Sequence, residues 1–241
     1  MNNIGFGIFC FGEDYYYRGT KEKIKQLLNV GLPVYVLTDK PEEFTDVTVI
    51  QYDRHLKSYS DKMILPKYIL KNHDICILLD ADTHVTDYSF LESLKTYNFK
   101  KGVSYIDTLL NHSAKKEFVK NLVDETNPEW KTYVEYASKL YPPFFNFETM
   151  WEYFLVINKD GFDVDSFYYY YEKLQVVKEY SDLPLKKEIS GAGEGISIQI
   201  SCKSANIEIQ RDIELYKLLE GKMISISRRH TPRHLWPNWM K

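Results

Sequence analysis

The first 110 residues of the chain alternate short apolar runs with segments of helical period. The apolar runs have the length of strands, and they lie at residues 4–11, 33–38, 47–51 and 75–79. The last of these runs is apolar at every position, which is typical of a strand that is buried on both faces of a parallel sheet. Strands that alternate with helices predict an α/β fold with a doubly wound sheet.

Two helices are predicted between these strands. Residues 20–30 place their apolar side chains on one helical face, with Thr20 as the expected N-cap and Gly31 as the stop. Residues 58–71 also have a helical pattern but contain Pro66. Because proline costs about 3 kcal/mol inside a helix, this second helix is expected to start late or to kink at Pro66.

The second half of the chain is less regular. Its pattern predicts strands at 102–106, 153–158 and 206–210, and helices at 114–123, 131–140 and 167–180. Residues 190–202 alternate apolar and polar positions as a strand does, so their pattern is ambiguous. No repeat or low-complexity linker divides the chain. We therefore expect a single domain over 1–241, with a first half (1–110), a second half (111–226) and an irregular tail (227–241).

Composition narrows the class of protein. The chain has 44% hydrophobic and 27% charged residues and a formal net charge of −3, which argues against a nucleic-acid binder. Cys10, Cys76 and Cys202 are far apart in apolar stretches, which predicts buried, reduced thiols and a cytoplasmic protein. No stretch approaches the roughly 18 apolar residues of a membrane span, so neither a span nor a signal peptide is expected. Peripheral contact with a membrane stays open.

The feature with the clearest chemistry is Asp80-Ala81-Asp82, which directly follows the apolar run at 75–79. Along a strand, residues i and i+2 point to the same face, so both carboxylates are expected to project together. They would repel each other unless a cation lay beside them. Carboxylates suit Mg²⁺ or Mn²⁺, with a substrate phosphate completing the shell, and open α/β sheets bind ligands at their strand ends. The alternative is a strand-end turn with two solvated carboxylates.

A second Asp-x-Asp sequence lies at Asp163 and Asp165. It follows Gly161 and precedes a predicted helix, which favours a capping cluster over a metal site.

Residues 78–83 resemble the Asp-x-Asp motif of the GT-A superfamily of glycosyltransferases. The resemblance covers residues 4–110 and implies a mixed, mostly parallel sheet flanked by helices, with the first half binding a nucleotide sugar. Three segments match the superfamily's nucleotide-sugar-binding parts: the first strand and the loop after it, the Thr-Asp-x-Pro ending at 38–41, and the Ser-Asp-Lys segment at 60–62. The resemblance implies that Ala81 and the following residues of these segments contact the nucleotide sugar: Phe9, Cys10, Phe11, Tyr17, Arg18, Asp39 and Lys62. A UDP-sugar and Mn²⁺ or Mg²⁺ are the expected ligands, with Asp80 and Asp82 binding the metal.

Two later segments resemble the superfamily more loosely. Glu194, in a glycine-rich stretch, is similar to the acidic residue at a helix start near the reacting sugar carbon, which favours a helix over 195–202. The alternative for Glu194 is a carboxylate that complements the helix dipole. In the tail, His230 is the expected third metal ligand, with His234 as second choice. The resemblance also implies that three tail arginines neutralise the diphosphate: Arg228, Arg229 and Arg233. The alternative is that the basic tail serves solubility or binds anionic lipid.

An aromatic stretch at 144–153 is interleaved with carboxylates. Rings stack on the C–H faces of sugars, and acids accept their hydroxyl protons, so Glu148, Trp151 and Glu152 are candidates to bind a saccharide acceptor. Core packing before a strand is an equal alternative.

Together these features predict a metal-dependent glycosyltransferase that acts on a saccharide or another hydroxyl acceptor. The first alternative is a sugar-phosphate nucleotidyltransferase, although residues 12–15 are acidic and aromatic where that class usually has a Gly-rich basic loop. The second is a non-catalytic module that binds nucleotides or carbohydrates. Donor sugar, acceptor, stereochemistry and oligomeric state stay open at the level of sequence.

Overall fold

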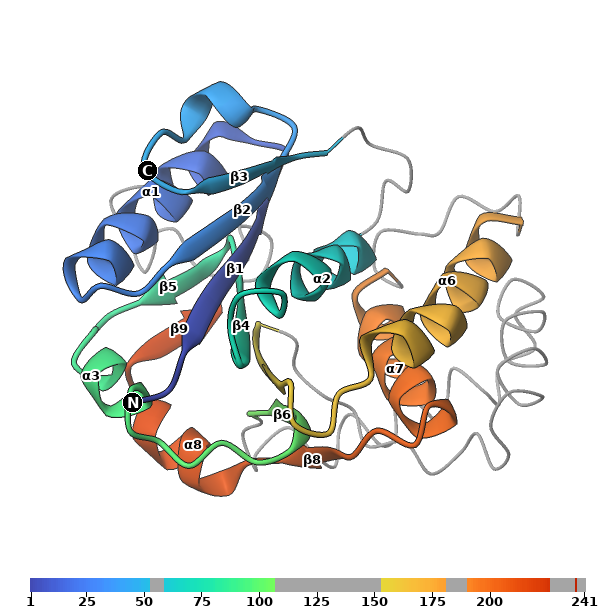
Figure 1. Cartoon of the computed structure of the whole chain (residues 1–241). Coiled ribbons are helices and arrows are strands. Elements are labelled where there is room, and N and C mark those ends of the chain that lie inside the picture. The colour runs from blue at the N-terminus through green and yellow to red at the C-terminus, as the bar shows by residue number, and fades with distance from the viewer. Residues whose placement is uncertain (53–58, 107–152, 181–189, 226–236, 238–241) are drawn as a thin grey trace.

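The computed structural model describes residues 1–52, 59–106, 153–180, 190–225 and 237. Within them, seven strands form a mixed sheet in the order β3-β2-β1-β4-β7-β6-β8 (Figure 1). Their bounds are β1 (Ile4–Cys10), β2 (Val34–Thr38), β3 (Thr48–Gln51), β4 (Ile75–Asp80), β6 (Gly102–Tyr105), β7 (Phe154–Asn158) and β8 (Ile209–Arg211). Neighbouring strands are parallel except where β7 meets β4 and β6. The predicted α/β fold with a mixed, mostly parallel sheet is confirmed.

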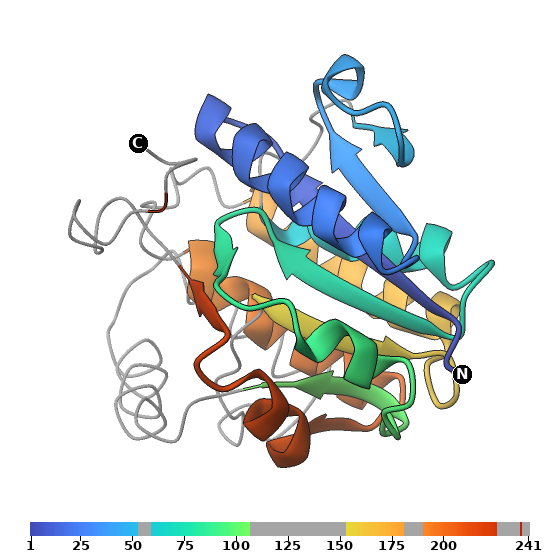
Figure 2. The same cartoon turned by 90° about the vertical axis from the view of Figure 1, so that its left-hand side faces the viewer.

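Helices cover both faces of this sheet (Figures 1 and 2). One apolar core lies between the sheet and α1 (Asp14–Asn29), α3 (Phe90–Leu94) and α8 (Ile213–Leu219). The second core lies between the other face and α2 (Leu65–Ile69), α6 (Val164–Tyr180) and α7 (Ser190–Ser204). A short 3₁₀ segment, η2 (Tyr59–Ile64), leads into α2. We call the two sides the α1 face and the α2 face.

Strand β4 shows why its sequence is apolar throughout. Ile75, Ile77 and Leu79 belong to the core of the α1 face, whereas Cys76 and Leu78 belong to the core of the α2 face. Because successive side chains alternate, Asp80 is directed to the α2 face and Ala81 packs on the α1 face.

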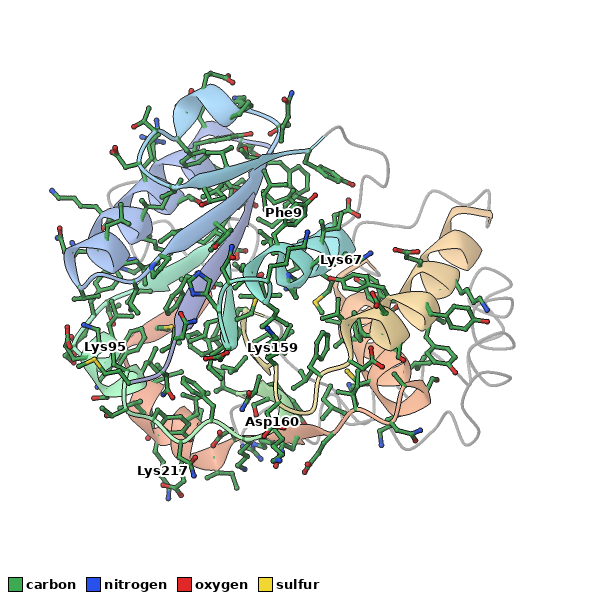
Figure 3. The ribbon with its side chains drawn as sticks, in the orientation of Figure 1. Phe9, Lys67, Lys95, Lys159, Asp160 and Lys217 are labelled. Carbon is green, nitrogen blue, oxygen red and sulfur yellow. The ribbon has the colours of Figure 1, made fainter. Side chains whose placement is uncertain are left out.

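The direction of the strands defines one functional edge. Strand β7 is antiparallel to both β4 and β6, so β6 runs parallel to β4, and the carboxyl ends of all strands except β7 share one edge. In Figure 3, Phe9 lies near this edge, and Asp160, which follows β7, lies at the opposite one. Ligands of open α/β sheets bind at the carboxyl ends of strands, where Asp80 lies.

Helix α2 packs unusually close to β1, which fixes the position of η2 just before it. A Cβ atom at Gly5 would lie 2.7 Å from the Ile69 side chain, and one at Gly7 would lie 2.9 Å from the same residue. Pro66 lies in the first turn of α2, where its missing N–H costs nothing. The expected helix over 58–71 is therefore a 3₁₀ segment followed by a helix that starts late.

Three other element boundaries differ from prediction by three residues or more, and one of them is the start of α6, at Val164 instead of residue 167. Helix α1 begins at Asp14, so Thr20 is a fully buried residue within it and the predicted N-cap is wrong. The rings of Tyr15 and Tyr17 are buried, so their burial extends the helix toward its N-terminus. The predicted strand at 206–210 starts later, because Asn206 has a positive φ of 55° that belongs to a turn.

Segment 190–202 is a helix, as the resemblance implied, within α7. Its alternation resembled a strand because polar and apolar positions are both buried, among them Ser197, Ile198 and Gln199. The predicted helices at 114–123 and 131–140 lie outside the described residues. All three cysteines are buried and without a disulfide, as predicted. No helix in the described ranges has the length and apolar character needed to cross a bilayer.

Candidate metal and nucleotide site

Strand β4 ends at Asp80, and Ala81 and Asp82 form a turn before the short strand β5 (Thr83–Val85). We call residues 80–83 the acidic turn. Strand β5 pairs with β9 (Met223–Ser225), so the turn is tied to the sequence just before the tail. The side chain of Asp80 is 30% exposed, and Asp82 is partly buried as well. Strand alternation, from which we expected both carboxylates on one face, ends at Asp80 and does not set the direction of Asp82.

Lys62 reaches the acidic turn from the α2 face. Its Nζ lies 2.9 Å from Oδ1 of Asp80, and the lysine is only 5% exposed. The close packing of α2 on β1 holds η2, and with it Lys62, at the strand edge. Lys62 was predicted from the sequence to reach the nucleotide, and the structure brings it to the same edge as Asp80.

A second lysine, Lys23, reaches the turn from the α1 face, and sequence reasoning missed it. Its Nζ donates hydrogen bonds to the carbonyl oxygens of Ala81 at 2.8 Å and Thr83 at 2.9 Å. Lys23 is 2% exposed. A signal was present in the sequence, because Lys23 lies on the helix face that Ile24 and Leu27 bury, and a buried ammonium group requires polar partners.

The charges in this turn act on one another. Burial lowers the pKa of Lys23 to about 8, and the carboxylates of Asp82 and Asp80 oppose that shift. Burial, followed by the charge of Asp80, raises the pKa of Asp82 to about 7, while Lys23 and Lys62 act in the opposite direction. A carboxylate whose negative charge is disfavoured in this way would be stabilised by a divalent cation.

The donor set fits a hard divalent cation only in part. Across the described ranges, no third His, Cys, Asp or Glu joins the two aspartates in a group that could hold a metal. The remaining ligands would come from water, from phosphate oxygens, or from residues in the ranges that are not described, which include His230 and His234.

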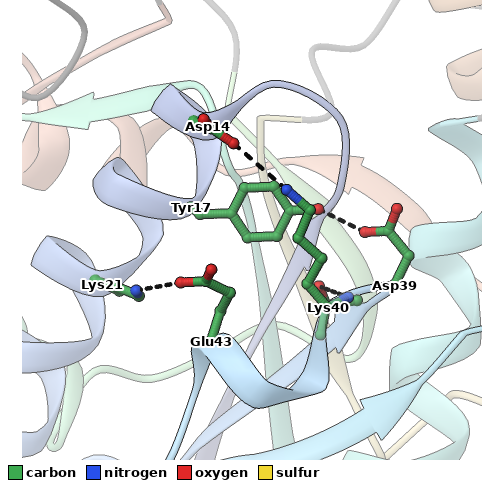
Figure 4. A network of polar contacts seen from close by, with 7 residues as sticks. Asp14, Tyr17, Lys21, Asp39, Lys40 and Glu43 are labelled. Carbon is green, nitrogen blue, oxygen red and sulfur yellow. Dashed lines mark hydrogen bonds and ion pairs between the residues drawn. The ribbon is translucent and has the colours of Figure 1, made fainter.

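The end of β2 carries a second polar group near the same edge (Figure 4). The hydroxyl of Tyr17 donates to Oδ1 of Asp39 at 2.5 Å, and the ammonium of Lys40 lies 4.4 Å from the centre of the Tyr17 ring. Burial and the bond to Asp39 raise the pKa of Tyr17, so its hydroxyl stays protonated. Asp39 is exposed at the strand end. The structure thus brings together two residues that the resemblance had assigned to the nucleotide.

Three aromatic rings gather near Lys62. The rings of Phe9 and Phe11 are 4.5 Å apart, and the ring of Tyr52 lies 5.9 Å from that of Phe9. The hydroxyl of Tyr52 donates to Asp61, the residue before Lys62. The resemblance implied both phenylalanines and included Asp61 in its segment 60–62, but Tyr52 was missed, because nothing along the chain indicates that these segments meet.

The other predicted site residues are placed differently. Cys10 is fully buried on the α1 face, and burial raises the pKa of its thiol to about 12, so it is a neutral core residue. Arg18 is exposed on α1. Helix α7 starts at Ser190, so Glu194 lies beyond its first turn and not at the helix start that was expected; α7 itself packs against η2. The remaining candidates lie outside the described residues: Glu148, Trp151, Glu152, Arg228, Arg229, His230 and Arg233.

Comparisons with known proteins give fold-level likeness only. No protein-family model and no curated protein sequence matches the chain. The galactosyltransferase LgtC, solved with donor and acceptor sugar analogues, aligns with a TM-score of 0.46 and 10% identity over 90% of this chain and 79% of that chain.

The catalytic domain of Drosophila β1,4-galactosyltransferase 7, solved with xylobiose, aligns with a TM-score of 0.43 and 11% identity over 95% of this chain and 73% of that chain. A mutant of the same enzyme, solved with manganese, UDP-Gal and xylobiose, has a TM-score of 0.40, 11% identity, and coverages of 94% and 72%. These structures are glycosyltransferases, the class that the sequence resembles. Every one of these TM-scores is below 0.5, so the alignments carry no argument about function.

Proposed function

We propose that the chain is a metal-dependent glycosyltransferase, which moves a sugar from a nucleotide-sugar donor to a saccharide or another hydroxyl acceptor. The observation that carries this proposal is the acidic turn itself. Asp80 and Asp82 follow a buried parallel strand at the ligand-binding edge of the sheet, and two buried lysines hold the turn from opposite faces. A merely solvated turn would have no need of two buried ammonium groups.

The residues around the turn suit the parts of a nucleotide sugar. Asp80 and Asp82 would hold Mn²⁺ or Mg²⁺, which supplies Lewis-acid stabilisation of the leaving diphosphate when it is bound. Lys62 would add positive charge beside the phosphates. The rings of Phe9, Phe11 and Tyr52 offer apolar faces on which a base can stack. A UDP-sugar is the donor that we propose.

Residues outside the described ranges complete the proposal. His230 would be the third metal ligand, and the tail arginines Arg228, Arg229 and Arg233 would meet the diphosphate. Glu148, Trp151 and Glu152 would bind the acceptor. Within the described residues, Glu194 of α7 would act as the base in an inverting reaction, or would stabilise the sugar cation in a retaining one. The position of α7 beside η2 supports this role, because it brings the helix of Glu194 close to the segment of Lys62.

A donor screen tests the proposal. The full chain would be incubated with Mn²⁺ and a panel of UDP-, GDP- and CMP-sugars together with saccharide acceptors. We expect release of UDP and a product heavier by one sugar, whose linkage NMR would establish. Release of pyrophosphate from a nucleoside triphosphate and a sugar phosphate would instead identify a nucleotidyltransferase. Tight UDP binding without turnover of any donor would favour a non-catalytic module.

A further inference from the structure

The two lysines of the acidic turn come from different parts of the fold and meet at one place. Lys23 belongs to α1 on one face of the sheet, and Lys62 belongs to η2 on the other. Both are almost fully buried, at 2% and 5% exposed. Burying a lysine costs several kcal/mol unless its charge is compensated, so two such residues at one turn indicate a shared electrostatic role.

That role follows from which groups each lysine touches. Lys62 forms a direct ion pair with Asp80 at 2.9 Å. Lys23 instead bonds the two carbonyl oxygens that flank Asp82, at 2.8 and 2.9 Å, and its charge also acts on the Asp82 carboxylate. The acidic turn thus has two carboxylates, Asp80 and Asp82, and two ammonium groups, Lys23 and Lys62, and the formal charges of these four groups balance.

A charge-balanced turn attracts a lone dication weakly. A cation that approaches Asp80 competes with the ammonium of Lys62 for that carboxylate, and it also meets the repulsion of Lys23. A diphosphate that arrives with the cation changes this balance, because its negative charge can accept Lys62 when that lysine leaves Asp80. The anion and the cation would then enter as one neutralised unit.

We infer that Lys23, together with Lys62, is the internal counter-ion of the acidic turn and makes binding of the divalent cation depend on the nucleoside diphosphate that accompanies it. This inference rests on the proposed function, since it concerns the same site. Lys23 acts through Asp82 and the turn, so it is a positioning residue and not a catalytic one.

The test measures Mn²⁺ binding to the full chain by electron paramagnetic resonance, without turnover. Wild-type protein is titrated with Mn²⁺ alone and with Mn²⁺ in the presence of UDP. We expect UDP to tighten Mn²⁺ binding by about tenfold or more, the scale set by one unit charge near a dication at high effective dielectric. Equal affinity in the two titrations would overturn the inference. Absence of any UDP binding would instead contradict the proposed function.

Two variants sharpen the test because the counter-ion role and structural damage predict opposite signs. In Lys23→Met and Lys62→Met, Mn²⁺ alone is expected to bind about tenfold more tightly than in wild type. Lys62→Arg keeps the charge and is expected to bind Mn²⁺ as weakly as wild type. Lys25→Met, on the exposed face of α1, is the matched control and is expected to change nothing.

Thermal unfolding of each variant separates folding from binding. If Lys23→Met does not fold, Lys62→Met and the UDP dependence of wild type still decide the question. If the folded methionine variants bind Mn²⁺ alone as wild type does, or more weakly, the lysines are not counter-ions and the inference fails.

Discussion

The chain contains the Asp-x-Asp pattern twice, and the two copies have opposite environments. At residues 163–165, both carboxylate oxygens of Asp163 accept hydrogen bonds at the start of α6, from the backbone N–H groups of Asp165 and Ser166 at 3.1 Å and the Ser166 hydroxyl at 2.7 Å. These bonds lower the pKa of Asp163. At residues 80–82, burial and a neighbouring carboxylate raise the pKa of Asp82.

The difference shows that the pattern alone carries little information about function. Asp163 is fully satisfied by its own helix and needs no cation, as its position before a helix predicted. Asp82 lies where its charge is disfavoured, at the edge where sheets bind ligands. The structural difference therefore predicts that one copy serves activity and the other serves stability.

The largest effect is expected on turnover. Asp82→Ala is expected to lower Mn²⁺-dependent UDP-sugar turnover by about 100-fold or more, since the cation that offsets the leaving charge loses a ligand. Asp163→Ala is the matched variant and is expected to keep nearly all activity. Released UDP measures both. Equal losses in the two variants would remove the distinction between the copies.

Removal of the divalent metal is also expected to lower turnover. Treatment with EDTA is expected to abolish turnover, and added Mn²⁺ is expected to restore it, because Asp80 and Asp82 are hard oxygen ligands. The thermal unfolding temperature of the chain without nucleotide should change little on chelation. Full activity after dialysis against EDTA would exclude a metal role for the acidic turn.

A moderate effect on stability is expected for Lys23→Met. The variant leaves the carbonyl oxygens of Ala81 and Thr83 without their ammonium donor, which costs about 1–3 kcal/mol in the free energy of unfolding. Lys25→Met, at an exposed position of the same helix, is expected to stay within about 0.5 kcal/mol of wild type. Urea denaturation measures both, and equal stabilities would mean that the buried lysine contributes no net hydrogen bonding.

The smallest effect concerns the capping copy and its dependence on pH. Because hydrogen bonds lower the pKa of Asp163 in the folded state, its stabilising contribution is present above the unfolded pKa of about 3.9 and is lost as pH falls through the folded value. Asp163→Asn is expected to lower Tm by a few degrees at pH 7 and to match wild type near pH 2. Melting curves across this pH range provide the check, and a constant difference at all pH values would contradict it.

The position of the acidic turn at the carboxyl end of β4 could be predicted from the sequence, because this strand is apolar at each position up to Asp80. That run identified a doubly buried strand, and its end identified the acidic turn. The capping role of Asp163 could be predicted equally well, because helix capping is a local interaction. Both predictions depend on residues that are adjacent in the chain.

The lysines and the aromatic neighbours could be predicted only in part. Lys23 lies 58 residues before Ala81, and its partners are carbonyl oxygens, which leave no trace in a side-chain pattern. Tyr52 meets Phe9 only because β3 and β1 flank the same strand, β2. Helix α7 has a strand-like pattern along the chain, because a helix buried on several sides loses the polar stripe that normally identifies it.

The central claim is that the acidic turn binds a metal and a diphosphate together, and calorimetric titration of UDP tests it most directly. Wild-type, Asp82→Asn and Asp163→Asn proteins would each be titrated with UDP, with and without Mn²⁺. We predict Mn²⁺-dependent UDP binding in wild type and in Asp163→Asn, and its loss in Asp82→Asn. UDP affinity that is the same in all three proteins and unaffected by Mn²⁺ would contradict the claim.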